Sequence, residues 1–283
     1  MTEPLLSLSL SARYREGSSV LNELSLEINS GEILGLVGQS GCGKSTLALA
    51  LLRLLHLKGG KATGKVQFSG RELMDLDERE MRGLRGKEIA LVLQSPIASL
   101  NPALRIGTQF AETWKAHRSG SADECRRDVL KALASVMLPA DDDFLSRHPS
   151  QLSVGQAQRV LIAMAVMHHP LLLIADEPTS ALDIITQSEI LALFRRLSRE
   201  LGMAILYISH DLLSVATIAD RIAVMHQGTI VECSTARGIF SFPQHAYTRA
   251  LVASLPVPPS WAAAVNLEAS ASPRVRAQVV GRS

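Results

Sequence analysis

Residues 38–46 are Gly38-Gln39-Ser40-Gly41-Cys42-Gly43-Lys44-Ser45-Thr46, which fits the pattern G-x-x-x-x-G-K-[S/T]. Glycines in such a loop let successive backbone N–H groups curl around phosphate oxygens. A helix that starts near Lys44 adds the positive end of its dipole to the same site. In this pattern the lysine contacts the β- and γ-phosphates of a nucleotide, and the Ser45 hydroxyl binds Mg²⁺. The whole stretch is therefore predicted to bind the phosphates of a nucleotide.

The segments on either side of this loop favour a phosphate site over a chance glycine turn. Residues 33–37 form a continuous apolar run, as expected of a strand buried on both faces of a sheet. Residues 46–57 have the pattern of a helix. Strand, loop and helix in this order are the context that the phosphate-binding pattern requires. Within the loop, Cys42 is expected either to have a favoured thiolate, because of the N–H groups around it, or to be a small filler residue.

A second apolar run, residues 171–175, ends in two adjacent acids, Asp176 and Glu177. Ligands of α/β folds bind at the carboxyl ends of the strands, where these two side chains are expected. Asp176 is predicted to hold Mg²⁺ directly or through water, and Glu177 to act as the general base on an attacking water. Without the glycine-rich loop, the same pair would simply be solvated acids at a strand end.

Two further motifs complete an ordered set. Leu152-Ser153-Val154-Gly155-Gln156 lies between the glycine-rich loop and the acids, and Ser209-His210-Asp211 follows them. With residues 176–183, this set resembles the ATP-binding subunits of ABC transporters over roughly residues 5–255. The resemblance implies an α/β fold: a P-loop ATPase core with a mainly parallel sheet, an antiparallel β subdomain and an inserted helical lobe. It also implies ATP and Mg²⁺ as cofactors.

The resemblance assigns roles to three residues that alone would be unremarkable. Gln94, directly after the apolar run 89–93, matches the glutamine that reaches the metal and the attacking water. His210 matches the histidine that contacts the γ-phosphate, and Tyr14 matches the aromatic that stacks on adenine. A lone glutamine is more often a loop residue, a lone histidine more often structural, and a strand tyrosine more often packs.

The motif at residues 152–156 departs from the family pattern at one position. The family has Leu-Ser-Gly-Gly-Gln, and Val154 replaces the first glycine. In that family this motif, here Ser153, Val154, Gly155 and Gln156, acts on the ATP held by an opposite subunit, and Asp183 lies in a loop that crosses to it. A β-branched residue restricts the backbone and adds bulk at a helix start. We therefore expect Val154→Gly to raise ATPase turnover.

The pattern along the chain predicts one ATP-binding domain, residues 1–255, followed by a flexible tail, residues 256–283. Antiparallel strands are expected in residues 5–30, and a helical lobe at about 95–160 is expected inside the α/β core, with helices at 108–118 and 122–136. Alternating strands and helices elsewhere favour a mainly parallel sheet. The remaining strands are expected around residues 66–68, 89–93, 171–175, 205–208 and 222–225.

Composition limits the class of protein further. The net charge of +2 is too small to favour nucleic acid as a partner, and the 47% apolar and 20% charged residues are typical of globular proteins. Three scattered cysteines suggest neither a zinc site nor disulfides and favour the cytoplasm. No apolar window approaches the length that spans a bilayer, and residues 1–4 do not begin a secretory signal.

One C-terminal segment indicates a particular branch of the family. Residues 242–251, Phe-Pro-Gln-His-Ala-Tyr-Thr-Arg-Ala-Leu, resemble a feature of the oligopeptide, dipeptide and nickel importer ATPases, and residues 99–102 agree. No cysteine follows Cys233, so the iron–sulfur centre of some members is not expected. The resemblance implies two membrane-spanning permease subunits, a second and usually different ABC ATPase chain, an external solute-binding protein, and peripheral attachment to the cytoplasmic face of the plasma membrane. A regulatory or catalytically weak ABC subunit and a soluble ABC ATPase remain alternatives.

Overall fold

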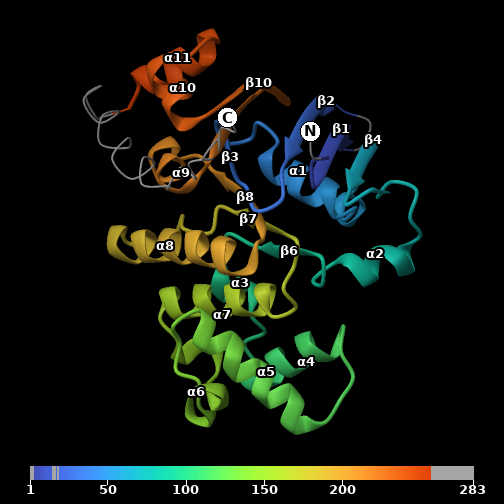
Figure 1. Cartoon of the computed structure of the whole chain (residues 1–283), viewed down its shortest axis with the longest axis vertical. Helices are drawn as coiled ribbons and strands as arrows, with labels where there is room; N and C mark the ends of the chain where they lie inside the picture. Colours follow the sequence, from blue (N-terminus) through green and yellow to red (C-terminus); the bar gives the residue numbers. More distant parts are fainter. Residues whose placement is uncertain (1–2, 15–16, 18, 256–283) are drawn as a thin grey trace, which may run out of the picture.

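The computed structural model describes residues 3–14, 17 and 19–255, and it contains two sheets and a group of helices at one end (Figure 1). The first sheet is antiparallel, with the strand order β2-β1-β4-β5. It confirms the antiparallel strands expected near the start of the chain. Its strands are β1 (Leu6–Tyr14), β2 (Ser19–Ile28), β4 (Gly60–Phe68) and β5 (Arg71–Glu72).

The second sheet has the strand order β10-β9-β3-β8-β7-β6. Its neighbours run parallel except for β10, which pairs antiparallel with β9. The mainly parallel sheet predicted from the sequence is therefore present. Its strands are β3 (Ile33–Val37), β6 (Ile89–Val92), β7 (Leu172–Asp176), β8 (Ala204–Ser209), β9 (Arg221–His226) and β10 (Thr229–Ser234).

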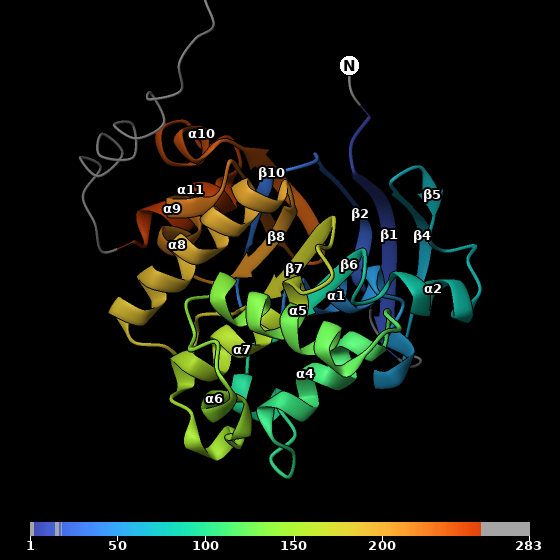
Figure 2. The same cartoon turned by 60° about the horizontal axis from the view of Figure 1, so that its bottom comes forward.

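Alternate residues of the parallel strands belong to two different hydrophobic cores. In β3, Leu34 and Leu36 pack with α1 and the antiparallel sheet, whereas Ile33 and Val37 pack with the helices on the opposite face. This follows from the two-residue period of a strand, which sends successive side chains to opposite faces. Figure 2 shows α8 and α9 on one side of the parallel sheet and the antiparallel strands on the other. Burial on both faces explains the continuous apolar runs in the sequence.

Most helices begin at residues that the sequence marks as caps. Ser121, Asp77 and Ser153 each accept a hydrogen bond from the backbone three residues on, and the glutamate or glutamine there bonds back. The core helices are α1 (Lys44–Leu51), α2 (Glu78–Leu84), α8 (Ile184–Leu201), α9 (Leu212–Ile218), α10 (Ala236–Ser241) and α11 (Ala246–Ala253), with a 3-10 turn at Leu55–Lys58. The helices between β6 and β7 are α3 (Pro96–Ser99), α4 (Ile106–Lys115), α5 (Ala122–Ser135), α6 (Asp142–Ser146) and α7 (Val154–Val166), with a 3-10 turn at Pro149–Gln151.

These inserted helices form the lobe at the bottom of Figure 1, far from α10 and α11 at its top. The helix predicted at residues 46–57 is shorter than expected, because α1 ends at Leu51 and Arg53 takes a left-handed φ of 52°. The strand β10 was not predicted. The predicted tail, residues 256–283, lies outside the described residues. Within residues 3–14, 17 and 19–255, no helix combines the length and apolar character needed to cross a membrane.

Candidate nucleotide-binding and hydrolysis site

Four neighbouring parallel strands, β3, β8, β7 and β6, end at the same edge of the sheet. The glycine-rich loop follows β3, His210 follows β8, Asp176 and Glu177 lie at the end of β7, and Gln94 lies two residues beyond β6. Residues separated by more than a hundred positions are therefore placed side by side by the strand order. This is the edge at which α/β folds bind ligands.

The glycine-rich loop has glycines where its backbone requires them. Gly43 caps α1 with a φ of 111°, a conformation that other residues rarely adopt. Gly38 lies so close to β9 that a Cβ atom there would be 2.3 Å from the carbonyl oxygen of Met225. Inside the loop, the Cys42 N–H donates to the Gln39 carbonyl over 3.3 Å. The loop is therefore tightly curled against the end of β9.

Lys44 lies within this curl although its side chain is charged. It is only 5% exposed, and its ammonium donates to the carbonyls of Gly38, at 2.8 Å, and Gln39, at 3.1 Å. A buried ammonium requires such partners, because an unpaired one is costly. The loop thus holds the lysine at the place where a phosphate-binding loop uses it.

Asp176 is buried beside the loop and has an open acceptor. Its Oδ1 atom has no hydrogen-bond partner among the described residues. Burial raises the pKa of Asp176, as does the charge of Glu177, while a hydrogen bond with Ser45 and the charge of Lys44 oppose the rise. An unpartnered carboxylate oxygen next to a serine hydroxyl fits Mg²⁺, which prefers one or two protein oxygens together with phosphate oxygens. No cluster of three or more His, Cys, Asp or Glu side chains that could hold a metal alone occurs in the described part of the chain.

Two other predicted residues converge on the carboxylate of Glu177. Its Oε2 atom accepts a hydrogen bond from the Gln94 amide at 3.1 Å and lies 3.3 Å from Nδ1 of His210. The side chain of Glu177 is 17% exposed, and its backbone has a left-handed φ of 48°. Strained conformations of this kind are found at functional sites, where the surroundings enforce them. Glu177 is thus oriented by both its backbone and its neighbours.

Tyr14 lies at the end of β1 beside the start of α1. Its hydroxyl is 3.2 Å from Oγ1 of Thr46, and its ring packs against Gly60 at the start of β4. The glycine makes room, because a Cβ atom at position 60 would be 2.9 Å from the tyrosine ring. The ring is partly exposed next to the loop, a position compatible with the predicted contact to adenine.

Cys42 corrects one expectation. Burial raises the pKa of its thiol, and this outweighs the lowering by the charge of Lys44 and by backbone N–H groups. The thiolate, one of the two interpretations of Cys42, is therefore disfavoured. The sulfur packs against Gly38, where a Cβ would approach it to 2.8 Å. Cys42 fits the alternative interpretation of a small filler residue.

The motif at residues 152–156 lies on the helical lobe, at the start of α7. The Ser153 hydroxyl accepts from the Gln156 N–H at 3.2 Å, and the Gln156 side chain accepts from the Ser153 N–H at 3.0 Å. Val154 is the first residue of the helix and does not have a positive φ. Valine thus occupies this position without a left-handed backbone, and the bulk of its branched side chain remains. Its side chain is 41% exposed.

Gly155, by contrast, has no room for a side chain. A Cβ atom there would be 2.8 Å from Cγ2 of Thr186 on α8. The carboxylate of Asp183 caps α8 by accepting from the N–H groups of Ile185 and Thr186, each at 3.0 Å, and from the Thr186 hydroxyl at 2.7 Å. These hydrogen bonds lower the pKa of Asp183. The starts of α7 and α8 are therefore in direct contact.

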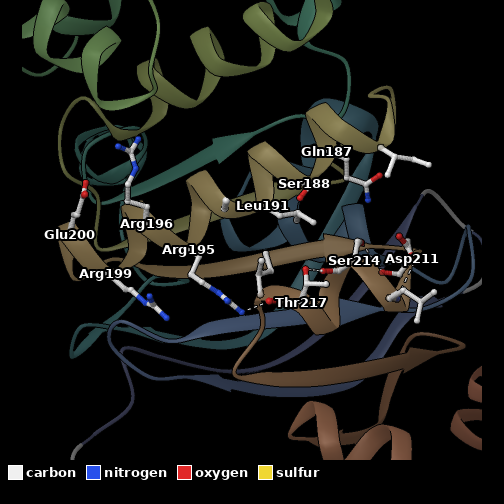
Figure 3. Close-up of a pocket in the computed structure, with 14 residues that line it drawn as sticks. Gln187, Ser188, Leu191, Arg195, Arg196, Arg199, Glu200, Asp211, Ser214 and Thr217 are labelled. Atoms are coloured by element: carbon white, nitrogen blue, oxygen red, sulfur yellow. Dashed lines mark hydrogen bonds between the residues drawn. The ribbon is translucent and has the colours of Figure 1, made fainter. Parts of the chain in front are cut away.

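A hollow of ≈ 900 Å³ lies between α8 and α9 (Figure 3). It starts beside Ile184 and Asp211, which immediately follow Asp183 and His210, and extends to Arg199. Arg195 donates across it to the carbonyl of Thr217. Within this hollow the hydrogen bond of Arg195 joins α8, which is capped by Asp183, to α9, which is capped by Asp211.

Comparison with known proteins identifies the family of this chain. The sequence model of the family described as ABC transporter matches residues 21–180. A dimeric structure of MJ0796, a bacterial ABC transporter cassette, has a TM-score of 0.70 and 30% sequence identity, and covers 82% of this chain and 99% of that one. The chain therefore belongs to the ABC transporter family.

Among its curated relatives is the glutathione import ATP-binding protein GsiA. The protein of Escherichia coli K12 is 44% identical over 244 residues, and that of Shigella dysenteriae serotype 1 is 43% identical over the same length. In both cases the match covers 84% of this chain and 39% of the relative. The chain thus spans about two fifths of the length of the curated relatives it matches.

The structure also adds residues that sequence reasoning missed. Tyr247, on α11, accepts a hydrogen bond from the N–H of Gln39 in the glycine-rich loop, at 3.2 Å. The two residues are 208 positions apart. The segment around Tyr247 was noted only as a family feature, and no local pattern indicates a contact over this separation.

Proposed function

We propose that this chain is the ATP-hydrolysing subunit of a membrane importer for small peptides. The observation that carries the proposal is the convergence of Gln94 and His210 on Glu177, next to Asp176 and the loop that holds Lys44. A carboxylate reached by two orienting groups beside a phosphate cradle has the parts needed for attack of water on a γ-phosphate.

In this proposal each residue of the sheet edge has a defined task. The backbone of the glycine-rich loop and Lys44 bind the phosphates, and Tyr14 contacts the adenine. Ser45 and Asp176, with Gln94, hold Mg²⁺, which supplies charge neutralisation at the phosphates. Glu177 takes the proton of the attacking water, Gln94 orients that water, and His210 contacts the γ-phosphate.

The start of α7 is proposed to act on a second nucleotide. Two cassettes would close on ATP, with Ser153, Gly155 and Gln156 of one chain facing the loop of the other and Asp183 crossing between them. The dimeric state reported for the MJ0796 cassette supports this arrangement. The exposed side chains of Ile184 and Ile185, 85% and 74% accessible, lie where such a partner would cover apolar surface.

The transported solute is proposed from the relatives. GsiA proteins are named for glutathione import, and glutathione is a small peptide. A peptide is therefore proposed as the transported solute in preference to nickel. Movement of the helical lobe would be transmitted to separate permease subunits at the cytoplasmic face of the membrane. An external solute-binding protein would deliver the peptide to those subunits. A second, different ATPase chain is the proposed partner.

A regulatory subunit with weak activity is the second candidate, and Val154 is the observation that favours it. Because Val154 is part of a regular helix, the only way in which it could weaken the site is through its exposed side chain.

The decisive experiment compares Lys44→Ala with Lys65→Ala, a matched loss of an exposed lysine on β4. We expect Lys44→Ala to abolish ATP binding and hydrolysis and Lys65→Ala to change neither. Cells that lack the chain should lose uptake of labelled glutathione or dipeptides, and the Lys65→Ala form alone should restore it. ATPase activity without any effect on uptake would instead indicate a soluble ABC ATPase.

The mass of Glu177→Gln in solution tests the pairing. Doubling of the mass on addition of ATP would show that two copies of this chain can close on each other. A persistent monomer that binds ATP would show that a different ATPase chain is required.

A further inference from the structure

The C-terminal helix α11 reaches the glycine-rich loop through one side chain, Tyr247. Its hydroxyl accepts a hydrogen bond from the Gln39 N–H at 3.2 Å. Its ring stacks on His226 with ring centroids 4.0 Å apart and an interplanar angle of 22°. Stacked aromatic rings at this spacing hold each other in a defined orientation. The hydroxyl is therefore placed at the loop by a ring contact as well as by its helix.

The bonded N–H belongs to a peptide unit that Lys44 also contacts. The Gly38 carbonyl and the Gln39 N–H are parts of one planar unit, and the described chain has no cis peptide bonds. In a trans unit these two groups point in opposite directions. The Lys44 ammonium donates to that carbonyl at 2.8 Å, at the opposite edge of the peptide unit from Tyr247. A single peptide unit is thus held at both edges by hydrogen bonds.

The support of Tyr247 comes from the strands that also confine the loop. The carboxylate of Glu232, on β10, accepts from the N–H groups of Gln244 and His245 at 2.9 Å each, at the start of α11. His245 in turn accepts from the N–H of Tyr247 at 3.1 Å. The strand β10 pairs with β9, which carries His226 next to the carbonyl that closes on Gly38. Loop, strand and helix therefore form one connected assembly.

We propose that Tyr247 is a positioning residue for nucleotide binding. By fixing the Gly38–Gln39 peptide plane, it fixes the direction of the Gly38 carbonyl and thereby the place of the Lys44 ammonium. This inference rests on the proposed function, because it acts through the loop that is proposed to bind the phosphates. Tyr247 itself touches neither nucleotide nor water in this scheme.

The variant Tyr247→Phe isolates the hydroxyl, since it keeps the ring that stacks on His226. Loss of one hydrogen bond of this kind is expected to raise KM and Kd for ATP roughly two- to tenfold. Because Lys44 contacts phosphate before and during the reaction, kcat should change much less than KM. Hydrogen–deuterium exchange of the peptide that contains Gln39 should accelerate, while Tm stays that of the wild type.

Two further variants separate positioning from general stability. Ser254→Ala removes a hydroxyl from the other end of α11, where its one hydrogen bond to described residues goes to the Leu251 carbonyl, and should leave KM unchanged. His226→Ala removes the stacking partner and should raise KM with the Tyr247 hydroxyl still present. His226→Phe restores a flat partner and should return KM toward the wild-type value.

The outcomes distinguish this inference from the proposed function. Unchanged KM, Kd and loop exchange in Tyr247→Phe would overturn the positioning role, even if Lys44→Ala abolishes binding. Normal ATP binding by Lys44→Ala would overturn the proposed site itself. A rise of KM in Tyr247→Phe that is matched by an equal rise in Ser254→Ala would also refute the inference, because it would reflect the packing of α11.

Discussion

The sheet-edge site and the start of α7 differ in how their polar groups are engaged. At the sheet edge, two groups converge on Glu177, and Asp176 keeps an acceptor without a partner in the described chain. At the start of α7, Ser153 and Gln156 bond to each other and complete a helix cap. The first region keeps polar groups available for a ligand, as the proposed function requires. The second already forms a complete helix cap, so only its outer surface is available for contacts.

This difference also applies to the departure from the family pattern at residue 154. Val154 occupies an ordinary helical position and points outward, so it changes a surface but no backbone geometry. Gly155, one residue on, lies against Thr186 and has no such freedom. Sensitivity to substitution within the motif is therefore set by what each residue packs against.

The largest effect is expected at the sheet edge. Glu177→Gln removes the proposed general base but keeps the size of the side chain, so turnover should fall by about 10²- to 10⁴-fold. ATP binding should persist. Single-turnover hydrolysis and nucleotide titration measure the two separately, with Glu27→Gln, an exposed carboxylate on β2, as the control. Turnover within a few-fold of the wild type would remove Glu177 from its proposed role.

A smaller effect, on stability, is expected at the contact between α7 and α8. Gly155→Ala places a Cβ 2.8 Å from Cγ2 of Thr186 and should cost about 1–3 kcal/mol of unfolding free energy. Thr186→Ser removes that methyl group but keeps the hydroxyl that bonds Asp183. The double variant should recover most of the loss in urea unfolding. Strictly additive losses would show that the two side chains do not meet.

Asp176 should respond to pH in the nucleotide-free chain. Because burial raises its folded pKa, its stabilising contribution is full below the unfolded value near 3.8 and is lost as pH rises through the folded pKa. Asp176→Asn should therefore be more stable by about 1 kcal/mol near pH 7, with the difference shrinking toward pH 4. Calorimetry between these pH values tests this. A variant that is less stable at neutral pH would contradict the proposed open acceptor.

The smallest effect is expected at position 154. Val154→Gly should lower the unfolding free energy by less than about 1 kcal/mol, because glycine is a poor helix residue. Turnover should rise, since the bulk on the outer surface of α7 is removed. ATPase assays at saturating ATP measure this. Unchanged or lower turnover would show that the valine does not hinder the proposed contact with a second nucleotide.

The sheet-edge site could be predicted from the sequence because each of its residues follows an apolar strand. Strand, motif and chain order together placed Lys44, Asp176, Glu177 and His210 at one edge. The ends of elements were less predictable. The helix α1 stops early because the chain turns at Arg53, which has a left-handed φ and whose guanidinium donates to the carbonyls of Leu73 and Leu76.

The errors arise from interactions that a local pattern does not contain. The pKa of Cys42 depends on its burial against the loop, and this outweighs the charge of Lys44. The contact of Tyr247 with Gln39 joins residues near opposite ends of the chain, so only the folded arrangement of β9, β10 and α11 reveals it. Likewise, only the folded lobe shows that Val154 takes the first position of α7 without a positive φ.

The left-handed backbone at Glu177 also affects which inactivating mutations the folded chain can accept. Such a φ costs a residue with a side chain about 1–2 kcal/mol, and glycine or asparagine would carry little of that cost. Mutations that inactivate position 177 in this way are therefore expected to make the chain more stable. A duplicated copy with glycine or asparagine in place of the proposed general base is therefore expected to fold well and to bind nucleotide without turnover.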